Sequence, residues 1–395
     1  MPDQKNITAK KMRVLSIGSD RNLFVPGSAV RQRVAEQGSL AEELHVIVFS
    51  LASSGLKPEP LSDRVWLYPT NSSRKLSYVR DAARIGTQIA RDRNFSPADS
   101  LVTVQDPFES GMAGARISRA TGLRLHVQIH TDFLSPYFAF GFLNMLRVRI
   151  ARRILPKASE IRVVSERIRR SLVRKCRIPE EKISVLPVFV DAEKIRRQHP
   201  SPLLDLHKKH PQFEFIALVL SRLEPEKNIS LALNAFAIAT RDPLQRPDAG
   251  LVVVGSGSEE PRLKAEAARL GLNGRIVFLP WTDDPQSFYK TADLLLVPSR
   301  YEGYGLTLAE SALSGCVALT TDVGIAGDLL VDGKNALVCP ASDEKGFAAK
   351  LQGFMMSGSV QKALRQGLAQ LDLSSFPSRE HYLEAYAKSW EATLG

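Results

Sequence analysis

The chain has 395 residues, of which 44% are hydrophobic and 24% are charged, and this composition is typical of a soluble globular protein. A length of this size favours two domains, since a domain usually holds about 100–200 residues. The polar N-terminus predicts no secretory signal. The longest uncharged apolar run, residues 136–145, is shorter than the roughly 20 residues that a membrane-spanning helix needs.

The formal net charge of +11 comes from the N-terminal half. Residues 1–200 hold 34 Lys and Arg against 19 Asp and Glu, whereas residues 201–395 hold 19 against 23. Such a basic half is compatible with nucleic acid, anionic lipid or simple solubility. The three cysteines, Cys176, Cys316 and Cys339, have neither metal-ligand spacing nor the pattern of a disulfide framework, which predicts a reducing, cytoplasmic location.

In chain order, short apolar runs predict strands at residues 13–17, 45–49, 65–68, 101–104, 125–129, 161–164 and 183–188. Further runs follow at residues 213–220, 251–254, 276–279, 294–297, 317–320 and 336–338. Several are apolar throughout, as LVVV and LLLV are, which is typical of strands buried on both faces of a parallel sheet. Because helical patterns separate these runs, the sequence predicts an α/β fold.

A polar, proline-containing segment near residues 190–212 separates the two strand-rich halves. We therefore predict an N-terminal Rossmann-like domain over residues 1–195 and a second one over residues 196–371. Residues 372–395 are expected to form a helix that joins the first domain, with Tyr382, Tyr386 and Trp390 at helical spacing. Open α/β sheets bind ligands beyond the carboxyl ends of their strands, so those positions are the candidates for a site.

The most informative segment is PSRYEGYGLTLAESALSG, which follows the strand at residues 294–297. Gly303 and Gly305 favour a tight turn, a helix is predicted over residues 306–314, and Gly315 ends it. Glu310 is the single charge between residues 303 and 321, and a carboxylate in such apolar surroundings is costly unless it is paired.

A second segment, SRLEPEKN, follows the strand at residues 213–220 and places Arg222 and Lys227 after a carboxyl end. By themselves they could be two solvated loop cations. In the first half, His130 directly follows the strand at residues 125–129, and a lone His is more often structural than functional. Asp106 and Glu109, after the strand at residues 101–104, could line an acceptor pocket or cap a helix; capping is the more common use of acidic residues at a helix start, so we do not assign them to catalysis.

Together these segments resemble family 4 of the retaining glycosyltransferases with the GT-B fold, also called glycosyl transferases group 1. The spacing of Glu302 and Glu310 matches the Glu-x7-Glu signature, and the second segment resembles G-R-L-x-x-E-K-G, except that Ser221 and Asn228 replace glycines. The resemblance covers nearly the whole chain in order and is most specific over residues 213–340. It implies two Rossmann-like domains that face each other across a cleft.

The resemblance also implies a role for each matched position. Glu302 would bind the hydroxyls of the transferred sugar, Glu310 the ribose, and Arg222 and Lys227 the diphosphate, while His130 would contact the sugar. The remaining positions implied to bind the nucleotide-sugar are Gly27, Ser28, Gly255, Trp281, Gly303, Tyr304, Gly305 and Leu306. Taken by itself, Gly255 indicates only a turn between a strand and a helix. Trp281 could equally be a tryptophan packed in the protein interior.

The predicted activity is therefore transfer of a sugar from a nucleotide diphosphate to an acceptor hydroxyl, in the synthesis of a cell-envelope glycan or glycolipid. No Asp-x-Asp occurs in the sequence, so we expect no metal and no other cofactor. The alternatives are a nucleotide-sugar epimerase of the same fold, a dinucleotide-dependent oxidoreductase and a basic RNA-binding protein. A glycosidase would also use two carboxylates but needs no cations for a diphosphate.

The expected partners are the nucleotide-sugar, a sugar or lipid-linked acceptor, and an anionic membrane surface, with no nucleic acid. The membrane prediction rests on residues 136–177, where a helical pattern puts Phe142, Leu146, Ile150 and Ile154 on one side, with arginines around them. Basic amphipathic helices bind lipid interfaces in this way. The alternative is that the apolar side packs on the sheet.

Overall fold

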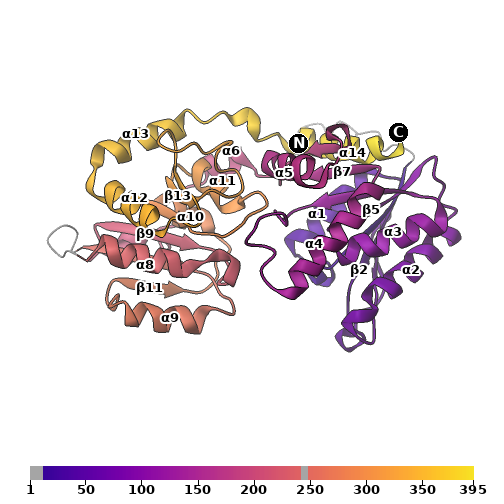
Figure 1. Ribbon diagram of the computed structural model, residues 1–395, viewed down its shortest axis with the longest axis horizontal. Coiled ribbons are helices and arrows are strands. Elements are labelled where there is room, and N and C mark those ends of the chain that lie inside the picture. Colours follow the sequence, from indigo (N-terminus) through magenta and orange to yellow (C-terminus); the bar gives the residue numbers. More distant parts are fainter. Residues whose placement is uncertain (1–11, 242–247) are drawn as a thin grey trace. The chain divides into compact units, whose positions relative to one another are not determined.

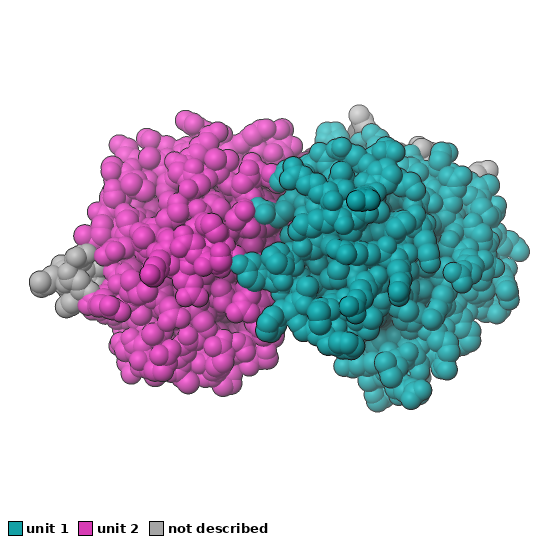
Figure 2. Space-filling model, viewed as in Figure 1, with its two compact units in different colours: residues 1–187, 379–395 teal, residues 188–378 magenta. Residues whose placement is uncertain are grey.

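The structure is a computed structural model and describes residues 12–241 and 248–395. It divides into two compact units, unit 1 with residues 1–187 and 379–395, and unit 2 with residues 188–378 (Figure 2). The chain therefore leaves unit 1 once and returns to it for its last helix. Within the described residues, none of the helices combines the length and the apolar character that crossing a bilayer requires.

The first change of unit falls at residues 187/188, whereas the sequence predicted residues 195/196. The difference arises because helix α6 (Ala192–Arg197) packs on α11 (Leu306–Leu313) of unit 2. Lys290 of unit 2 also donates hydrogen bonds to the carbonyl oxygens of Arg196 and Gln198. The second change falls at residues 378/379, where α14 begins, rather than at residues 371/372.

Unit 1 contains a sheet with the order β3-β4-β2-β1-β5-β6-β7-β8 in its described residues. Its strands are β1 (Arg13–Gly18), β2 (Glu43–Val48), β3 (Glu59–Ser62), β4 (Val65–Pro69), β5 (Ser100–Val104), β6 (Arg124–Ile129), β7 (Glu160–Val163) and β8 (Ile183–Val185). Neighbouring strands are parallel except β3, which pairs antiparallel with β4. The sequence did not predict β3, because this short edge strand contains Pro60 and is not continuously apolar.

Helices cover both faces of this sheet (Figure 1). They are α1 (Ala29–Gln37), α2 (Tyr78–Asp92), α3 (Glu109–Thr121), α4 (Phe142–Ile154), α5 (Glu166–Cys176) and α14 (Arg379–Leu394). The C-terminal helix α14, yellow in Figure 1, packs on β5, β6 and β7. Its Tyr386 and Trp390 are almost completely buried in one apolar cluster with Val14 and Val46. The predicted helix at the C-terminus is confirmed.

Unit 2 contains a parallel sheet with the order β11-β10-β9-β12-β13-β14 in its described part. Its strands are β9 (Phe215–Leu220), β10 (Ala249–Val254), β11 (Ile276–Leu279), β12 (Leu294–Val297), β13 (Ala318–Thr321) and β14 (Leu337–Cys339). Its remaining helices are α7 (Leu206–Lys209), α8 (Ile229–Ala239), α9 (Glu260–Arg269), α10 (Pro285–Thr291), α12 (Glu344–Met356) and α13 (Gly358–Ala369). Strands β9 and β12 are neighbours at the middle of the sheet, so the loops that follow them lie together. The prediction of two parallel α/β sheets is confirmed.

Candidate functional site

The centre of the candidate site in unit 2 is an ion pair between the loops that follow β9 and β12. Lys227 Nζ lies 2.6 Å from Glu302 Oε1, and the two side chains are only 16% and 14% exposed. The hydroxyl of Ser299 donates a second hydrogen bond to the same oxygen at 2.7 Å. The fold therefore brings two residues that the sequence singled out into direct contact. A cation that is preorganised in this way can stabilise the negative charge that develops on a leaving group.

Arg222 lies at the edge of this group and is more accessible. Its Nη2 atom is 2.7 Å from Glu226 Oε1, and the Arg222 side chain is 62% exposed. Burial raises the pKa of Tyr301, Glu226 and Glu302 raise it further, and Arg222 lowers it. The backbone N–H of Arg300 donates to the carbonyl oxygen of Glu226 at 2.8 Å, so the loop that carries Arg222 and the loop that carries Glu302 are joined directly.

The loop after β12 ends in the N-terminus of α11. Gly305 has a φ of +84° and is the residue just before the helix, where a side chain would be strained. Its neighbour Tyr304 is buried, and the Tyr304 carbonyl accepts a hydrogen bond from Ile325 at 2.9 Å. Leu306, the first helical residue, is 41% exposed. The first backbone N–H groups of a helix lack partners within it and attract anions, which is a property that a diphosphate can use.

Glu310 lies within α11 and is mostly enclosed by protein. Burial raises its pKa to about 7, and a hydrogen bond from Tyr289 acts in the opposite direction. The hydroxyl of Tyr289, which is fully buried, is 3.3 Å from Glu310 Oε2. The expected pairing of this carboxylate is therefore found, but one hydroxyl leaves it with capacity for further hydrogen-bond donors.

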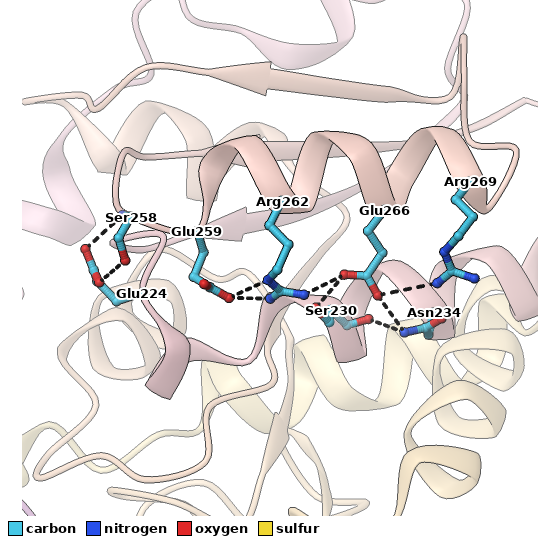
Figure 3. Close-up of polar contacts among 8 residues, drawn as sticks. All are labelled: Glu224, Ser230, Asn234, Ser258, Glu259, Arg262, Glu266 and Arg269. Atoms are coloured by element: carbon cyan, nitrogen blue, oxygen red, sulfur yellow. Dashed lines mark hydrogen bonds and ion pairs between the residues drawn. The ribbon is translucent and has the colours of Figure 1, made fainter. Parts of the chain in front are cut away.

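The loops after β9 and β10 are tied to each other. Glu224 accepts hydrogen bonds from the backbone N–H of Ser258 at 3.1 Å and from its hydroxyl at 2.7 Å (Figure 3). Gly255 has a φ of +146°, and a Cβ atom there would lie 1.9 Å from the carbonyl oxygen of Ser221. Gly255 is thus required for the close approach of the two loops; its predicted contact with the nucleotide stays a prediction.

Figure 3 shows how this attachment continues along α9. Arg262 pairs with Glu259 and with Glu266, and Glu266 also accepts hydrogen bonds from Ser230 and Asn234 of α8. These contacts join α8 and α9, the helices that follow the two loops. They support the loop at residues 221–228, which carries Arg222 and Lys227, and support of this kind limits the reorganisation that binding a diphosphate would require.

Trp281, predicted near the nucleobase, is 54% exposed and follows β11. The alternative of an ordinary packed tryptophan is therefore wrong. Its indole offers an open aromatic surface at the carboxyl end of a strand, the kind of surface on which a base can stack.

In unit 1, the predicted residues also follow carboxyl ends of strands. His130 comes directly after β6 and is exposed, with Nε2 at 3.3 Å from Gln105 Oε1. Gly27 has a φ of +78°, and Ser28 is the N-cap of α1, where its hydroxyl accepts a hydrogen bond from Arg31 N. Asp106 accepts hydrogen bonds from the backbone N–H groups of residues 108 and 110, so the prediction that it caps a helix is confirmed.

Glu109 differs from its expected use as a cap, because its carboxylate pairs with Arg147 of α4 at 3.1 Å. The basic stretch within residues 136–177 is also not one charged face. Arg162 is 2% exposed inside the core, and Arg169 pairs with Glu166 and Glu180. The stripe predicted along α4 is divided as well, since Ile154 is buried while Phe142 is 75% exposed.

Sequence reasoning missed Ser299, Tyr289 and Glu226. Ser299 is three residues before Glu302, so the spacing alone offered a weak signal. Tyr289 comes from α10, and only the packing of α10 on α11 brings it to Glu310. Among residues 12–241 and 248–395, no group of three or more His, Cys, Asp or Glu side chains is arranged to hold a metal ion.

Two family profiles match the two halves of this chain. Residues 37–194 match Glycosyltransferase Family 4, and residues 205–369 match Glycosyl transferases group 1. Among solved structures, the complex of Anabaena Alr3699/HepE with UDP and glucose superimposes with a TM-score of 0.73. That alignment has 19% sequence identity and covers 96% of this chain and 99% of the other.

The curated relatives share shorter segments. The poly(glycerol-phosphate) alpha-glucosyltransferase of Bacillus subtilis (strain 168) is 27% identical over 45% of this chain and 26% of its own length. The D-inositol 3-phosphate glycosyltransferase of Nocardia farcinica is 28% identical over 62% of this chain and 54% of its own length. The chain thus matches only a quarter to about half of the length of these relatives. Taken together, the profiles that match both halves and the shared architecture show that the chain belongs to family 4 of the GT-B glycosyltransferases.

Proposed function

We propose that the protein transfers a sugar from a nucleotide diphosphate to an acceptor hydroxyl with retention of anomeric configuration. The observation that carries this proposal is the Lys227–Glu302 pair, which joins the loops after β9 and β12, with Arg222 on the same loop as Lys227. It gathers cations for a diphosphate and a carboxylate for sugar hydroxyls in one place. The activities named for the curated relatives support sugar transfer, and lipopolysaccharide core biosynthesis, named for a mannosyltransferase of Rhizobium meliloti, supports a role in cell-envelope glycan synthesis.

In the proposed reaction, the bond from the anomeric carbon to the diphosphate oxygen breaks, and a bond to the acceptor oxygen forms on the same face. The proton of the acceptor hydroxyl goes to an oxygen of the leaving phosphate. Lys227, Arg222 and the N-terminus of α11 stabilise the charge that the diphosphate gains. Glu302 orients the sugar and forms no covalent intermediate, and Glu310 accepts hydrogen bonds from the ribose.

We further propose that the reaction needs no metal ion and no other cofactor, because these side chains supply the positive charge. The test is a panel of UDP-, GDP- and ADP-sugars, scored by thermal shift and by slow hydrolysis of the donor with and without chelator. One nucleotide should raise the melting temperature, and chelator should leave hydrolysis unchanged. Hydrolysis that chelator abolishes and metal restores would contradict metal independence.

The same panel tests the activity itself. The proposed activity fails if none of the nucleotide-sugars raises the melting temperature or is consumed. Release of an epimerised donor would indicate the epimerase instead.

Glu302→Gln should separate catalysis from nucleotide binding. Turnover should fall by about 10²-fold, the low end for loss of one preorganised polar group, because the sugar loses an ionised partner. Affinity for the free nucleoside diphosphate, measured by calorimetry, should stay close to that of the native protein. Glu344→Gln, an exposed carboxylate of the same unit, is the matched control. Equal losses of turnover and nucleotide affinity in Glu302→Gln would rule out its assignment to the sugar.

We also propose that the protein works in the cytoplasm with unit 1 on an anionic membrane surface, where it meets a lipid-linked acceptor. The support is the start of α4 and the residue before it. Phe140 is 86% exposed and Phe142 is 75% exposed, while Arg149 and Arg153 are exposed farther along the helix. Exposed aromatic side chains beside basic ones are suited to a lipid interface.

Sedimentation with vesicles that contain anionic lipid checks this proposal. Binding should occur at low salt and weaken at high salt, since each basic residue near the surface contributes about 1 kcal/mol. Reversing Arg149 and Arg153 to Glu should abolish binding and leave nucleotide affinity intact. The matched control reverses Arg116 and Arg119, exposed arginines of α3. Equal loss in both variants would indicate a general effect of charge, and absence of native binding at low salt would end the proposal.

A further inference from the structure

The loops after β9 and β12 need contacts of their own to stay adjacent, because the pairing of the two strands ends before the loops begin. Strand β9 pairs with β12 at residues 217–218 and 294–295, two residues before each strand ends. Beyond that point a side chain joins the loops. The Nδ2 atom of Asn228 donates a hydrogen bond to the carbonyl oxygen of Pro298 at 3.2 Å, so Asn228 connects the end of one loop to the start of the other.

The backbone of Asn228 has a left-handed conformation, with a φ of +50°. Glycine adopts this conformation without strain, and asparagine tolerates it better than most other residues. The family segment that this loop resembles has a glycine here, so asparagine preserves the turn. The N–H of Asn228 donates to the carbonyl oxygen of Pro225 at 3.2 Å, which closes the turn that contains Lys227. What asparagine adds to glycine is therefore its amide.

The amide of Asn228 is not used to cap a helix. Asn228 directly precedes α8, and an asparagine in that place commonly accepts a hydrogen bond from the first turn of the helix. Within the described part of the chain, the Asn228 side chain makes no such capping bond. It contacts the loop after β12 instead. A carbonyl oxygen can only accept, so the Asn228 atom that faces Pro298 must be the amide nitrogen.

We propose that Asn228 is a positioning residue, which fastens the loop after β9 to the loop after β12 and thereby holds the Nζ atom of Lys227 against Glu302. Lys227 directly precedes Asn228 in the chain, and its Nζ atom lies 2.6 Å from Glu302 Oε1. Both contacts lie within unit 2. The proposal rests on the proposed function, in which Lys227 stabilises the charge that the leaving diphosphate gains. Loss of the amide should therefore slow the reaction through Lys227.

The test variant is Asn228→Gly, which permits the left-handed backbone and removes the amide. Single-turnover hydrolysis of the sugar donor should slow about fivefold, as expected for the loss of one net hydrogen bond. The matched control is Asn71→Gly in unit 1. Asn71 also has a left-handed φ, of +45°, and its Nδ2 atom donates to the carbonyl oxygen of Leu56 at 2.8 Å. The control should hydrolyse the donor at the native rate.

A double-mutant cycle shows whether Asn228 acts through Lys227. In a chain that already carries Lys227→Ala, the further change Asn228→Gly should slow hydrolysis less than about twofold, because the side chain that it positions is gone. If Asn228 instead supported the whole loop, including Arg222, the effects of the two changes would multiply. Multiplication of the two effects would overturn the proposal.

The placement of Lys227 can also be followed without a donor, by labelling the lysine amines of the full chain with a trace of an acylating reagent and reading each site by peptide mass spectrometry. Native Lys227 should label slowly, because its side chain is 16% exposed and its amine is paired. Labelling requires the loop to open, so Asn228→Gly should raise the rate at Lys227 about fivefold, the same factor of one hydrogen bond. Lys264, which is 52% exposed, is the internal reference and should label alike in both proteins.

Unchanged labelling of Lys227 in Asn228→Gly would overturn the proposal. An equal increase in Asn71→Gly would also overturn it, since that result would indicate a general loosening of the protein. Faster labelling with native hydrolysis would overturn the effect of Asn228 on the reaction. Absence of hydrolysis by the native protein with every donor would overturn the proposed function instead, and labelling would still decide whether Asn228 holds Lys227 in place.

Discussion

The Lys227→Ala variant should turn over the sugar donor about 10²–10³-fold more slowly than the native protein, the range for loss of one preorganised group that stabilises developing charge. Lys227 is held by its ion pair with Glu302, and Glu302 is held in turn by a hydrogen bond from Ser299, before any ligand arrives. The cation therefore needs little reorganisation when the diphosphate gains charge. Arg222→Ala should have a smaller effect, because Arg222 is 62% exposed and its side chain is screened by solvent.

The measurement is single-turnover hydrolysis of the nucleotide-sugar that the panel identifies. Lys264→Ala is the matched control, since Lys264 forms an i,i+4 pair with Glu260 at 2.7 Å, much as Arg222 does with Glu226. The control should turn over like the native protein, and circular dichroism should show all variants folded. Near-native turnover when both Arg222 and Lys227 are replaced would refute the assignment to the diphosphate.

Glu310→Gln should make the protein more stable at pH 8 and at the same time weaken nucleotide binding. The folded-state pKa of Glu310 is about 7, against an ordinary value of 4.5, chiefly because of burial. Between these values the folded chain binds a proton that the unfolded chain does not, so the free energy of unfolding falls as pH rises through this window. Above pH 7 the ionised carboxylate costs about 3 kcal/mol at most, and a neutral amide avoids that cost.

Chemical denaturation at several pH values checks the stability part. Glu310→Gln and native protein should have similar stability near pH 4, and the variant should gain progressively up to about pH 8. Calorimetry at several pH values checks the prediction on nucleotide binding. The affinity of the native protein for nucleotide should rise with pH around 7, as Glu310 ionises, whereas the affinity of Glu310→Gln should not show this rise. Glu344→Gln, an exposed carboxylate in unit 2, should show neither effect. An identical pH profile of stability for Glu310→Gln and native protein would contradict the burial argument.

The strands were predictable because parallel strands buried on both faces leave uninterrupted apolar runs in the sequence. Strand β12, which reads LLLV and is fully buried, is an example. Strand β3 lacks this signal, since it lies at the sheet edge and half of its residues are exposed. The glycine turn before α11 was equally predictable, because the conformation of Gly305 is a local property of the backbone.

The contacts within the site were less predictable than the residues themselves. The spacing of Glu302 and Glu310 marked both, but nothing in it indicated that the first would meet Lys227 and the second Tyr289. Such contacts depend on which strands are neighbours and how the helices pack on them. Arg162 shows that burial was also hard to predict. A count of basic residues in the sequence adds it to the surface charge, although it is buried among hydrogen-bond acceptors.

The return of α14 to unit 1 has a consequence for biosynthesis. The ribosome makes unit 1's sheet before unit 2, yet Tyr386 and Trp390, among the largest fully buried side chains, are added only after unit 2. Until they emerge, the growing chain must hold unit 1 with an uncovered apolar surface over β5, β6 and β7. Transiently exposed surfaces of this kind are prone to aggregation. Unit 2, whose residues are contiguous, can complete its core earlier, so the half that is translated second can be the first to finish folding.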